Sequence, residues 1–224
     1  MRIAIANDVH GREPSRRNGL NPATPRVRRH RDGQLVAIGA SAGGPGALAR
    51  ILASLPGDFP AAVVIVQHVD ARFAPDLAHW LDQLTPLRVR LAHEGDRPQA
   101  GTVLLARGEH HLVFGSSTRL TYTRIPLESV YRPSIDVFFK SLRRHWHGEA
   151  VGVLLTGMGR DGAEGLRALR ERGCPTVAQD AATSAVYGMP RAAAELQAAG
   201  EILPLNRIGP RLVKMLDTRI HSHA

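Results

Sequence analysis

The sequence predicts an α/β fold: a doubly wound, mainly parallel sheet with helices on both faces and one β-hairpin. Apolar runs recur from residue 34 onward and are continuous, as expected for strands that are covered on both faces. Segments of helical composition separate these runs, and such alternation is typical of parallel sheets. One stretch instead places Gly115, Ser116 and Ser117 between two short apolar segments, which is typical of a hairpin.

The elements can be assigned in order along the chain. Strands are predicted at residues 35–38, 61–66, 103–106, 151–155 and 176–178, helices at 45–54, 74–84, 134–146, 163–172 and 191–199, and the hairpin at 111–123. Ser134 can cap the third helix, and Pro190 precedes the last one as a start signal. Residues 1–33, rich in Pro, Gly, Asn and Arg after a short apolar segment, are typical of a linker. We therefore predict a flexible basic linker over 1–33 and one domain over 34–224.

Composition excludes several classes of protein. Of the net charge of +9, more than half comes from residues 1–33, which contain eight Arg and three acidic residues. No basic run alternates with aromatic residues, so we predict no nucleic-acid partner. The longest apolar run has six residues, far short of the roughly 20 that cross a bilayer, and no signal-peptide segment is present at the start. We predict a cytoplasmic protein without an integral membrane segment.

The only cysteine and the paired histidines suggest no metal site. Cys174 cannot form an intramolecular disulfide or a thiolate cluster, and we expect it to pack as a half-buried side chain. His110 with His111, His145 with His147, and His221 with His223 have no further ligand at a recognised spacing. We therefore expect solvated surface histidines and no metal or organic cofactor.

Chemically useful side chains follow three predicted strands, and in such sheets chemistry collects outside the carboxyl ends of strands. Ser41 lies in the glycine-rich turn GASAGGPG between a strand and a helix, where it is well placed as a nucleophile beside backbone N–H groups. The same turn is also common as a phosphate-binding loop or as a purely structural connection. His68 directly follows the strand at 61–66 and has the basicity to exchange a proton with Ser41 near neutral pH.

Asp161 follows the strand at 151–155 and can supply the carboxylate that orients the imidazole. Its alternative role is ordinary capping of the next helix. The order Ser, His, Asp excludes the α/β-hydrolase fold, whose G-x-S-x-G motif the serine turn matches, because that fold runs Ser, acid, His. A serious competitor is a nucleotide-binding oxidoreductase, since GMGRDG matches G-x-G-x-x-G and Asp180 stands where a ribose-binding acid would lie. Against it, Asp161 would place a negative charge in the pyrophosphate loop.

Five ordered segments resemble the catalytic domain of CheB-type chemotaxis receptor methylesterases: GASAGGPGAL, VQHVDARFAPDLA, RPSIDVFFKSL, LLTGMGRDGAEGL and VAQDAATSAVYGMPRAA. The resemblance spans residues 34–220. It implies hydrolysis of γ-glutamyl methyl esters on methyl-accepting chemotaxis receptors, in opposition to a receptor methyltransferase, and deamidation of certain glutamines. It also implies a triad of Ser41, His68 and Asp161, with backbone N–H groups of Met158 and Ala42 binding the oxyanion. A catalytically silent signalling scaffold is the remaining alternative.

The sequence also departs from this family. Ala42 stands where the family often has Thr, so a hydroxyl that helps to hold the oxyanion is missing; Arg160 replaces a common Asn, and Asp70 a common Pro. Only MRIAIANDV resembles the start of the phosphoacceptor receiver domain of typical members, and we expect no control through a receiver. Arg132 and Asp136, in RPSIDVFF, can border the cleft and bind receptor carboxylate or amide groups, or form a structural salt bridge.

Overall fold

A parallel sheet forms the centre of the domain that the structure describes. The structure, a computed structural model, describes residues 33–220, and the predicted linker thus lies almost entirely outside the described residues. Within this range the sheet has seven strands, all paired in parallel, in the order β3-β4-β2-β1-β7-β8-β9. Their bounds are β1 Gln34–Ala40, β2 Ala61–Gln67, β3 Arg88–Leu91, β4 Thr102–Leu105, β7 Ala150–Leu154, β8 Thr176–Gln179 and β9 Glu201–Leu203. Strands β5 (His111–Phe114) and β6 (Leu120–Thr123) form an antiparallel pair.

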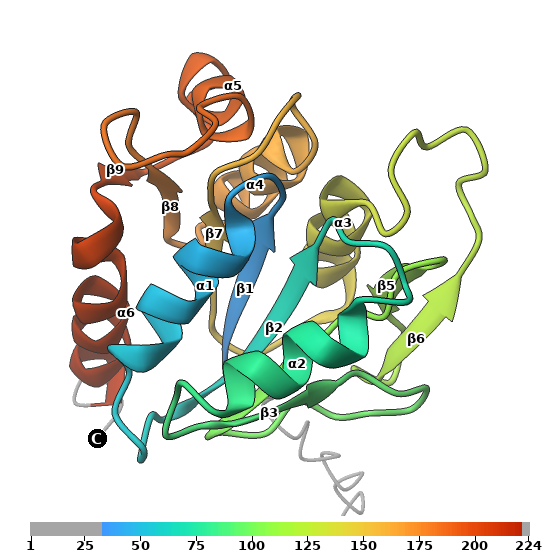
Figure 1. Ribbon diagram of the computed structural model, residues 1–224, viewed down its shortest axis with the longest axis horizontal. Helices are drawn as coiled ribbons and strands as arrows, with labels where there is room; N and C mark the ends of the chain where they lie inside the picture. The colour runs from blue at the N-terminus through green and yellow to red at the C-terminus, as the bar shows by residue number, and fades with distance from the viewer. Residues whose placement is uncertain (1–32, 221–224) are drawn as a thin grey trace, which may run out of the picture. The chain divides into compact units, whose positions relative to one another are not determined.

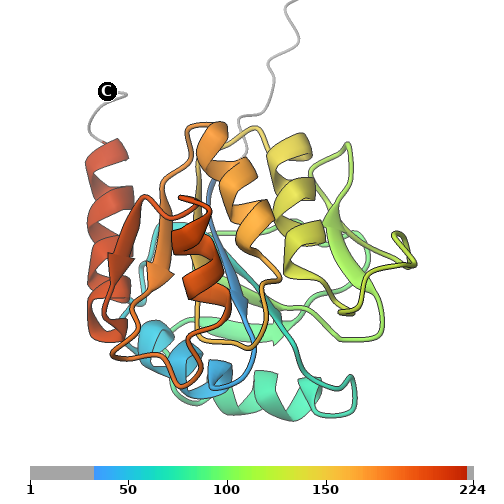
Figure 2. The ribbon, with the colours of Figure 1, turned by 90° about the horizontal axis from the view of Figure 1, so that it is seen from above.

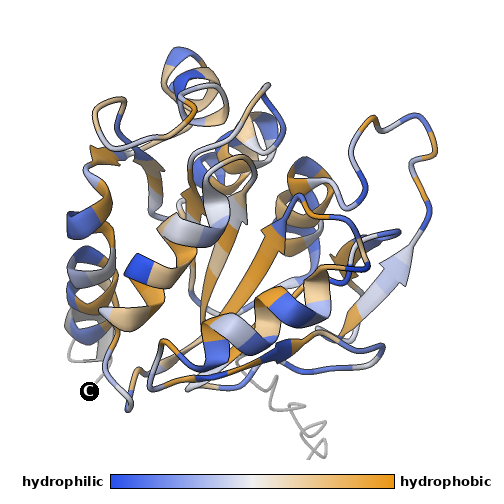
Figure 3. Ribbon diagram, in the orientation of Figure 1, coloured by the Kyte–Doolittle hydropathy of each residue, from blue (hydrophilic) through white to orange (hydrophobic). Residues whose placement is uncertain are grey.

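Helices cover both faces of the sheet (Figures 1 and 2). They are α1 Gly44–Ala53, α2 Ala74–Asp82, α3 Ile135–His145, α4 Ala163–Glu171, α5 Met189–Glu195 and α6 Leu205–Ile220. Alternate residues of β1 divide between two buried clusters: Val36 and Ile38 join α1, α2 and α6, whereas Leu35 and Ala37 join α3, α4 and α5. Because both of their faces are buried, β1 and β2 are apolar over most of their length (Figure 3).

The predicted fold class is confirmed, as are all five predicted strands, all five helices and the hairpin. Strands β3 and β9 and helix α6 were not predicted from the sequence. Strands β3 and β9 are the two edges of the sheet, and edge strands are exposed on one side and lack a continuous apolar run. Helix α6 contains Pro210, preceded by Gly209, a pair that usually indicates a break. Gly209 instead permits close packing, because a Cβ there would meet the Ser54 Oγ at the end of α1.

Candidate active site

Three neighbouring strands end at the edge of the sheet where the candidate residues lie. Strand β1 pairs with β2 on one side and β7 on the other, so their carboxyl ends meet (Figure 1). Ser41 follows β1, His68 follows β2, and Asp161 lies in the loop after β7. The chain continues from β1 to β2 on one side of the sheet and from β7 to β8 on the other, so the order of the strands reverses between β1 and β7. Doubly wound sheets bind ligands at such a point.

Ser41 lies in a tight turn between β1 and α1. Its backbone N–H donates to the Thr156 carbonyl at 3.0 Å, and its own carbonyl accepts from Gly44 N at 2.8 Å. Gly43 between them has φ +80°, a left-handed conformation that glycine adopts without strain. A Cβ on Gly157 would lie 2.7 Å from the Ser41 Cβ. The turn therefore holds Ser41 directly against the loop that follows β7.

Gln67, the last residue of β2, links Ser41 to His68. Its side-chain Nε2 donates to the carbonyl oxygens of both residues, each at 2.9 Å, and the side chain is almost fully buried. The His68 backbone N–H adds a bond of 3.0 Å to the Ala40 carbonyl. Gln67 was not among the residues predicted from the sequence, although a polar residue at the end of a six-residue apolar run was an available signal. Two strand exits are thus fixed relative to each other by one amide.

His68 and Asp161 form a partly buried pair. The His68 Nε2 lies 2.8 Å from the Asp161 Oδ2. Because an ionised carboxylate can only accept, Nε2 carries the hydrogen in the neutral ring and Nδ1 keeps its lone pair. Within residues 33–220, this Nδ1 is buried and has no hydrogen-bond partner. The ring nitrogen that can act as a base is therefore Nδ1, opposite to Asp161.

The Asp161 carboxylate is held at the N-terminus of α3. It accepts the Ser134 hydroxyl at 2.8 Å and the backbone N–H groups of Ile135 and Asp136 at 2.7 and 3.1 Å. Burial raises the pKa of this carboxyl, but the hydrogen bonds that it accepts outweigh burial, and the net shift of its pKa is downward. Ser134 is also the N-cap of α3, as predicted, and accepts from Val137 N. Asp161 therefore remains ionised and fixed in orientation.

The predicted oxyanion groups flank Ser41. Ala42 follows it directly, and Met158 follows Gly157, which packs closely against the Ser41 side chain. The Thr156 hydroxyl donates to the Ala42 carbonyl at 2.9 Å and accepts from Val186 N at 2.9 Å, so it joins the loops after β1 and β7. The Met158 side chain is 67% exposed at this edge. These positions suit two backbone donors near one carbonyl oxygen, and their oxyanion role stays a prediction.

Comparison with known proteins identifies the family. The family model described as CheB methylesterase matches residues 36–212. The chain belongs to the CheB methylesterase family. The resemblance inferred from the sequence motifs is thereby confirmed.

Individual relatives support the same assignment. A protein-glutamate methylesterase/protein-glutamine glutaminase of Cupriavidus pinatubonensis is 64% identical over 181 residues, which are 81% of this chain and 53% of that protein. A protein of the same name from Mesorhizobium japonicum is 54% identical over 95% of this chain and 62% of its own length. The chain thus spans little more than half the length of these relatives. The crystal structure of the Thermotoga maritima CheB methylesterase catalytic domain matches with a TM-score of 0.75 and 32% identity, covering 82% of this chain and 98% of that one.

Arg132 and Asp136 lie in different surroundings within this CheB domain. Arg132 is exposed and, with Asp70 and Glu109, lines a groove of about 410 Å³ beside the residues that follow His68. Asp136 is partly buried, and its carboxylate accepts from Gly165 N at 2.6 Å, so it joins α3 to α4. Burial raises the pKa of Asp136. The two residues therefore do not form the salt bridge considered above, and a substrate-binding role stays a prediction.

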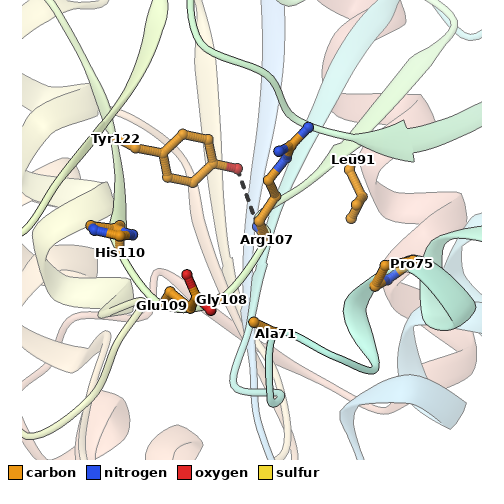
Figure 4. Close-up of a pocket in the computed structure, with 8 residues that line it drawn as sticks. All are labelled: Ala71, Pro75, Leu91, Arg107, Gly108, Glu109, His110 and Tyr122. Carbon is orange, nitrogen blue, oxygen red and sulfur yellow. Dashed lines mark hydrogen bonds between the residues drawn. The ribbon is translucent and has the colours of Figure 1, made fainter.

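A second cavity, of about 470 Å³, lies between the loop that follows β2 and the ends of β3 and β4 (Figure 4). Its wall includes Tyr122, whose hydroxyl accepts the Arg107 N–H at 3.1 Å and donates to the Ala92 carbonyl. The lining residues are Ala71, Pro75, Leu91, Arg107, Gly108, Glu109, His110 and Tyr122. None of the three proposed triad residues lines it. The cavity is therefore a neighbour of the candidate active site and no part of it.

One of the paired histidines, His111, has a structural role in this CheB domain. His111 was expected at the surface, but this expectation is wrong: it is fully buried, accepts the Ser134 N–H through Nδ1 at 3.0 Å and contacts the Pro126 carbonyl through Nε2.

Among residues 33–220, no three His, Cys, Asp or Glu side chains are grouped to hold a metal ion. In the same range no helix combines the length and apolar character needed to cross a bilayer.

The nucleotide-binding alternative is not favoured. The Asp161 carboxylate occupies the GMGRDG loop and is committed to His68 and the start of α3. Asp180, the counterpart of a ribose-binding acid, accepts from the backbone N–H and hydroxyl of Thr183 and stabilises its own loop. Both acids therefore have partners within the fold.

Proposed function

We propose that this domain is a serine hydrolase that cleaves γ-glutamyl methyl esters and also deamidates glutamine side chains. The observation that carries the proposal is the arrangement at the ends of β1, β2 and β7. Gln67 Nε2 bonds the carbonyl oxygens of Ser41 and His68. The His68 Nδ1 is buried without a hydrogen-bond partner among residues 33–220, and its Nε2 is bonded to Asp161 at 2.8 Å. The relatives named protein-glutamate methylesterase/protein-glutamine glutaminase support the same chemistry.

The mechanism is acyl transfer through Ser41. His68 Nδ1 removes the hydroxyl proton as the Ser41 oxygen attacks the ester carbonyl, and Asp161 stabilises the imidazolium that forms. The N–H groups of Ala42 and Met158 hold the oxyanion. The carbon–oxygen bond to the methoxy group then breaks, and methanol leaves with the proton from His68.

Water completes the cycle on the acyl-enzyme. His68 Nδ1 removes a proton from the water molecule, the hydroxide attacks the acyl carbon, and Ser41 recovers its proton as the glutamate carboxyl is released. When the substrate is a glutamine side chain, ammonia takes the place of methanol as the first product. Every step uses groups of the chain and water, and the proton that His68 takes in each half-reaction is returned.

The proposed substrates are methyl-accepting chemotaxis receptors in the cytoplasm, where the enzyme would oppose a receptor methyltransferase. Arg132 and Arg160 are exposed close to the site, and a guanidinium can pair with the carboxylates that demethylation leaves on a receptor. The family relationship supports this class of partner.

The deciding experiment measures methanol release from methylated receptor fragments. Ser41→Ala should reduce turnover by several orders of magnitude, roughly 10³-fold or more, with an unchanged unfolding temperature. A fluorophosphonate probe should label the wild type at Ser41 and leave the variant unlabelled. Near-normal methanol release by Ser41→Ala would refute the nucleophile assignment, and a wild type that neither turns over nor reacts with the probe would indicate a catalytically silent scaffold.

A further inference from the structure

We propose that Tyr131 is a positioning residue for His68: its ring fixes the plane of the imidazole and stabilises the imidazolium formed when Ser41 loses its proton. The inference rests on the proposed hydrolase function. Tyr131 belongs to the loop between β6 and α3 (Figure 1), and the sequence motifs did not single it out.

The two rings are stacked almost in parallel. Their centroids are 4.5 Å apart, and their planes differ by 5°. The loop carrying Tyr131 is braced beside this contact, because the Ser129 hydroxyl donates to the Tyr131 carbonyl at 3.0 Å. On the other side, a Cβ on Gly159 would lie 2.7 Å from the Tyr131 hydroxyl oxygen, so the ring extends to the turn after Met158. Tyr131 therefore lies between the proposed base and the loop that supplies an oxyanion donor.

His68 needs such a contact because its ring has one hydrogen-bond anchor. The bond from Nε2 to Asp161 fixes the position of one ring atom, but the ring can still turn about that bond. Within residues 33–220, the opposite nitrogen, Nδ1, makes no hydrogen bond that would prevent this. A flat aromatic surface against the imidazole face restricts the remaining rotation. The Tyr131 ring thus restricts the orientation of the imidazole, including that of its Nδ1 lone pair.

The stack also favours the charged ring over the neutral one. The face of an aromatic ring carries partial negative charge and attracts a cation within about 6 Å of its centroid. His68 becomes cationic only after it accepts the Ser41 proton, so the attraction is stronger in the transition state than in the resting enzyme. Interactions of this kind increase kcat rather than tighten substrate binding.

Two variants separate the ring from its hydroxyl. Tyr131→Phe keeps the stack, and we expect its kcat within about twofold of wild type. Tyr131→Leu removes the aromatic face, and we expect kcat for methyl-ester hydrolysis to fall roughly threefold to thirtyfold with little change in KM. The rate at which a fluorophosphonate labels Ser41 should fall by a similar factor in Tyr131→Leu alone. Unfolding temperatures are measured for each protein; if the Leu variant is unfolded, Tyr131→Met replaces it.

The separation of kcat from KM distinguishes positioning of His68 from general loosening of the loop. Loss of the ring should lower kcat in Tyr131→Leu and leave KM nearly unchanged, whereas a loosened loop should raise KM as well. Tyr131→Phe should keep both constants close to those of the wild type. Equal losses in both variants, or wild-type kinetics in Tyr131→Leu, would overturn the inference. A wild type that is not labelled at Ser41 would instead count against the proposed function itself.

Discussion

The Ser134 hydroxyl donates a buried hydrogen bond of 2.8 Å to the Asp161 carboxylate. This bond joins the N-terminus of α3 to the carboxylate that orients His68. The first backbone N–H groups of α3 point at the same carboxylate, and the positive end of the helix dipole stabilises its charge. Ser134 thus caps α3 by accepting a hydrogen bond and supports the proposed catalytic pair by donating one. Stability and activity are therefore coupled at this position.

Ser134→Ala should therefore lower both quantities. The variant loses the N-cap bond to Val137 and one of the bonds to Asp161, and the free energy of unfolding should fall by about 1–2 kcal/mol. Turnover should fall as well, because Asp161 is held less firmly. Urea unfolding and methanol release measure the two effects. Ser117→Ala, in the exposed turn between β5 and β6, is the control and should change neither.

His111 predicts a loss of stability in mild acid. Burial lowers the pKa of its imidazole below the value of about 6.5 expected in the unfolded chain, and only the neutral ring can accept the Ser134 N–H. The unfolded state therefore binds more protons as the pH falls below 6.5. The stabilising contribution is complete above that pH and is lost as the pH falls toward the folded-state pKa. Urea unfolding at pH 7.5 and pH 5.5 measures the loss.

His111→Asn is the matched comparison for this effect. Its amide oxygen can accept the Ser134 N–H but does not titrate between these pH values. We expect the variant to be less stable than wild type at pH 7.5 and to lose less on acidification. An equal pH dependence in both proteins would assign the acid sensitivity to other groups.

Gln67→Met should damage activity more than its cost in stability explains. The variant keeps the length of the side chain but loses both bonds to the Ser41 and His68 carbonyls, which should lower the free energy of unfolding by about 1–3 kcal/mol. Small displacements of reacting groups lower the reaction rate strongly, and we expect kcat to fall roughly tenfold to a hundredfold. Gln34→Met is the control, because Gln34 also makes two bonds, to Glu149 and Leu216, but at the opposite end of β1. Equal effects of the two substitutions on kcat would contradict a positioning role for Gln67.

The central strands and the proposed triad could be predicted from the sequence because one physical cause produces both signals. Strands β1, β2 and β7 are buried on both faces and are therefore continuous apolar runs, and polar residues just beyond such runs lie at the sheet edge. Ser41, His68 and Asp161 are of this kind. The edge strand β3 was missed because Arg88 and Arg90 interrupt its apolar pattern.

Long-range contacts determine the features of the site that could not be predicted from the sequence. Tyr131 reaches His68 through a loop from another layer of the fold, and no periodicity encodes that approach. His111 looked like one of a solvated pair, but the β5–β6 hairpin packs on α3 and encloses it. The burial of a single histidine depends on which element covers it. Local sequence can predict an element, but it does not state which other element lies against it.

Ala42→Thr should raise the rate of ester hydrolysis. The resemblance to CheB-type methylesterases implies Thr at this position in many members, and a hydroxyl there can add a donor to the oxyanion proposed to form at Ser41. One such donor is commonly worth a hundredfold or more in kcat, and a donor introduced without further adjustment should recover roughly tenfold. Ala42 is exposed, so the larger side chain needs no rearrangement of the core.

Ala42→Val, which has the same shape as Thr but no hydroxyl, is the matched control. Because both variants are β-branched, a gain in the Thr variant alone assigns the effect to the hydroxyl, whereas equal rates in the two would show that Ala42 supplies only its backbone N–H.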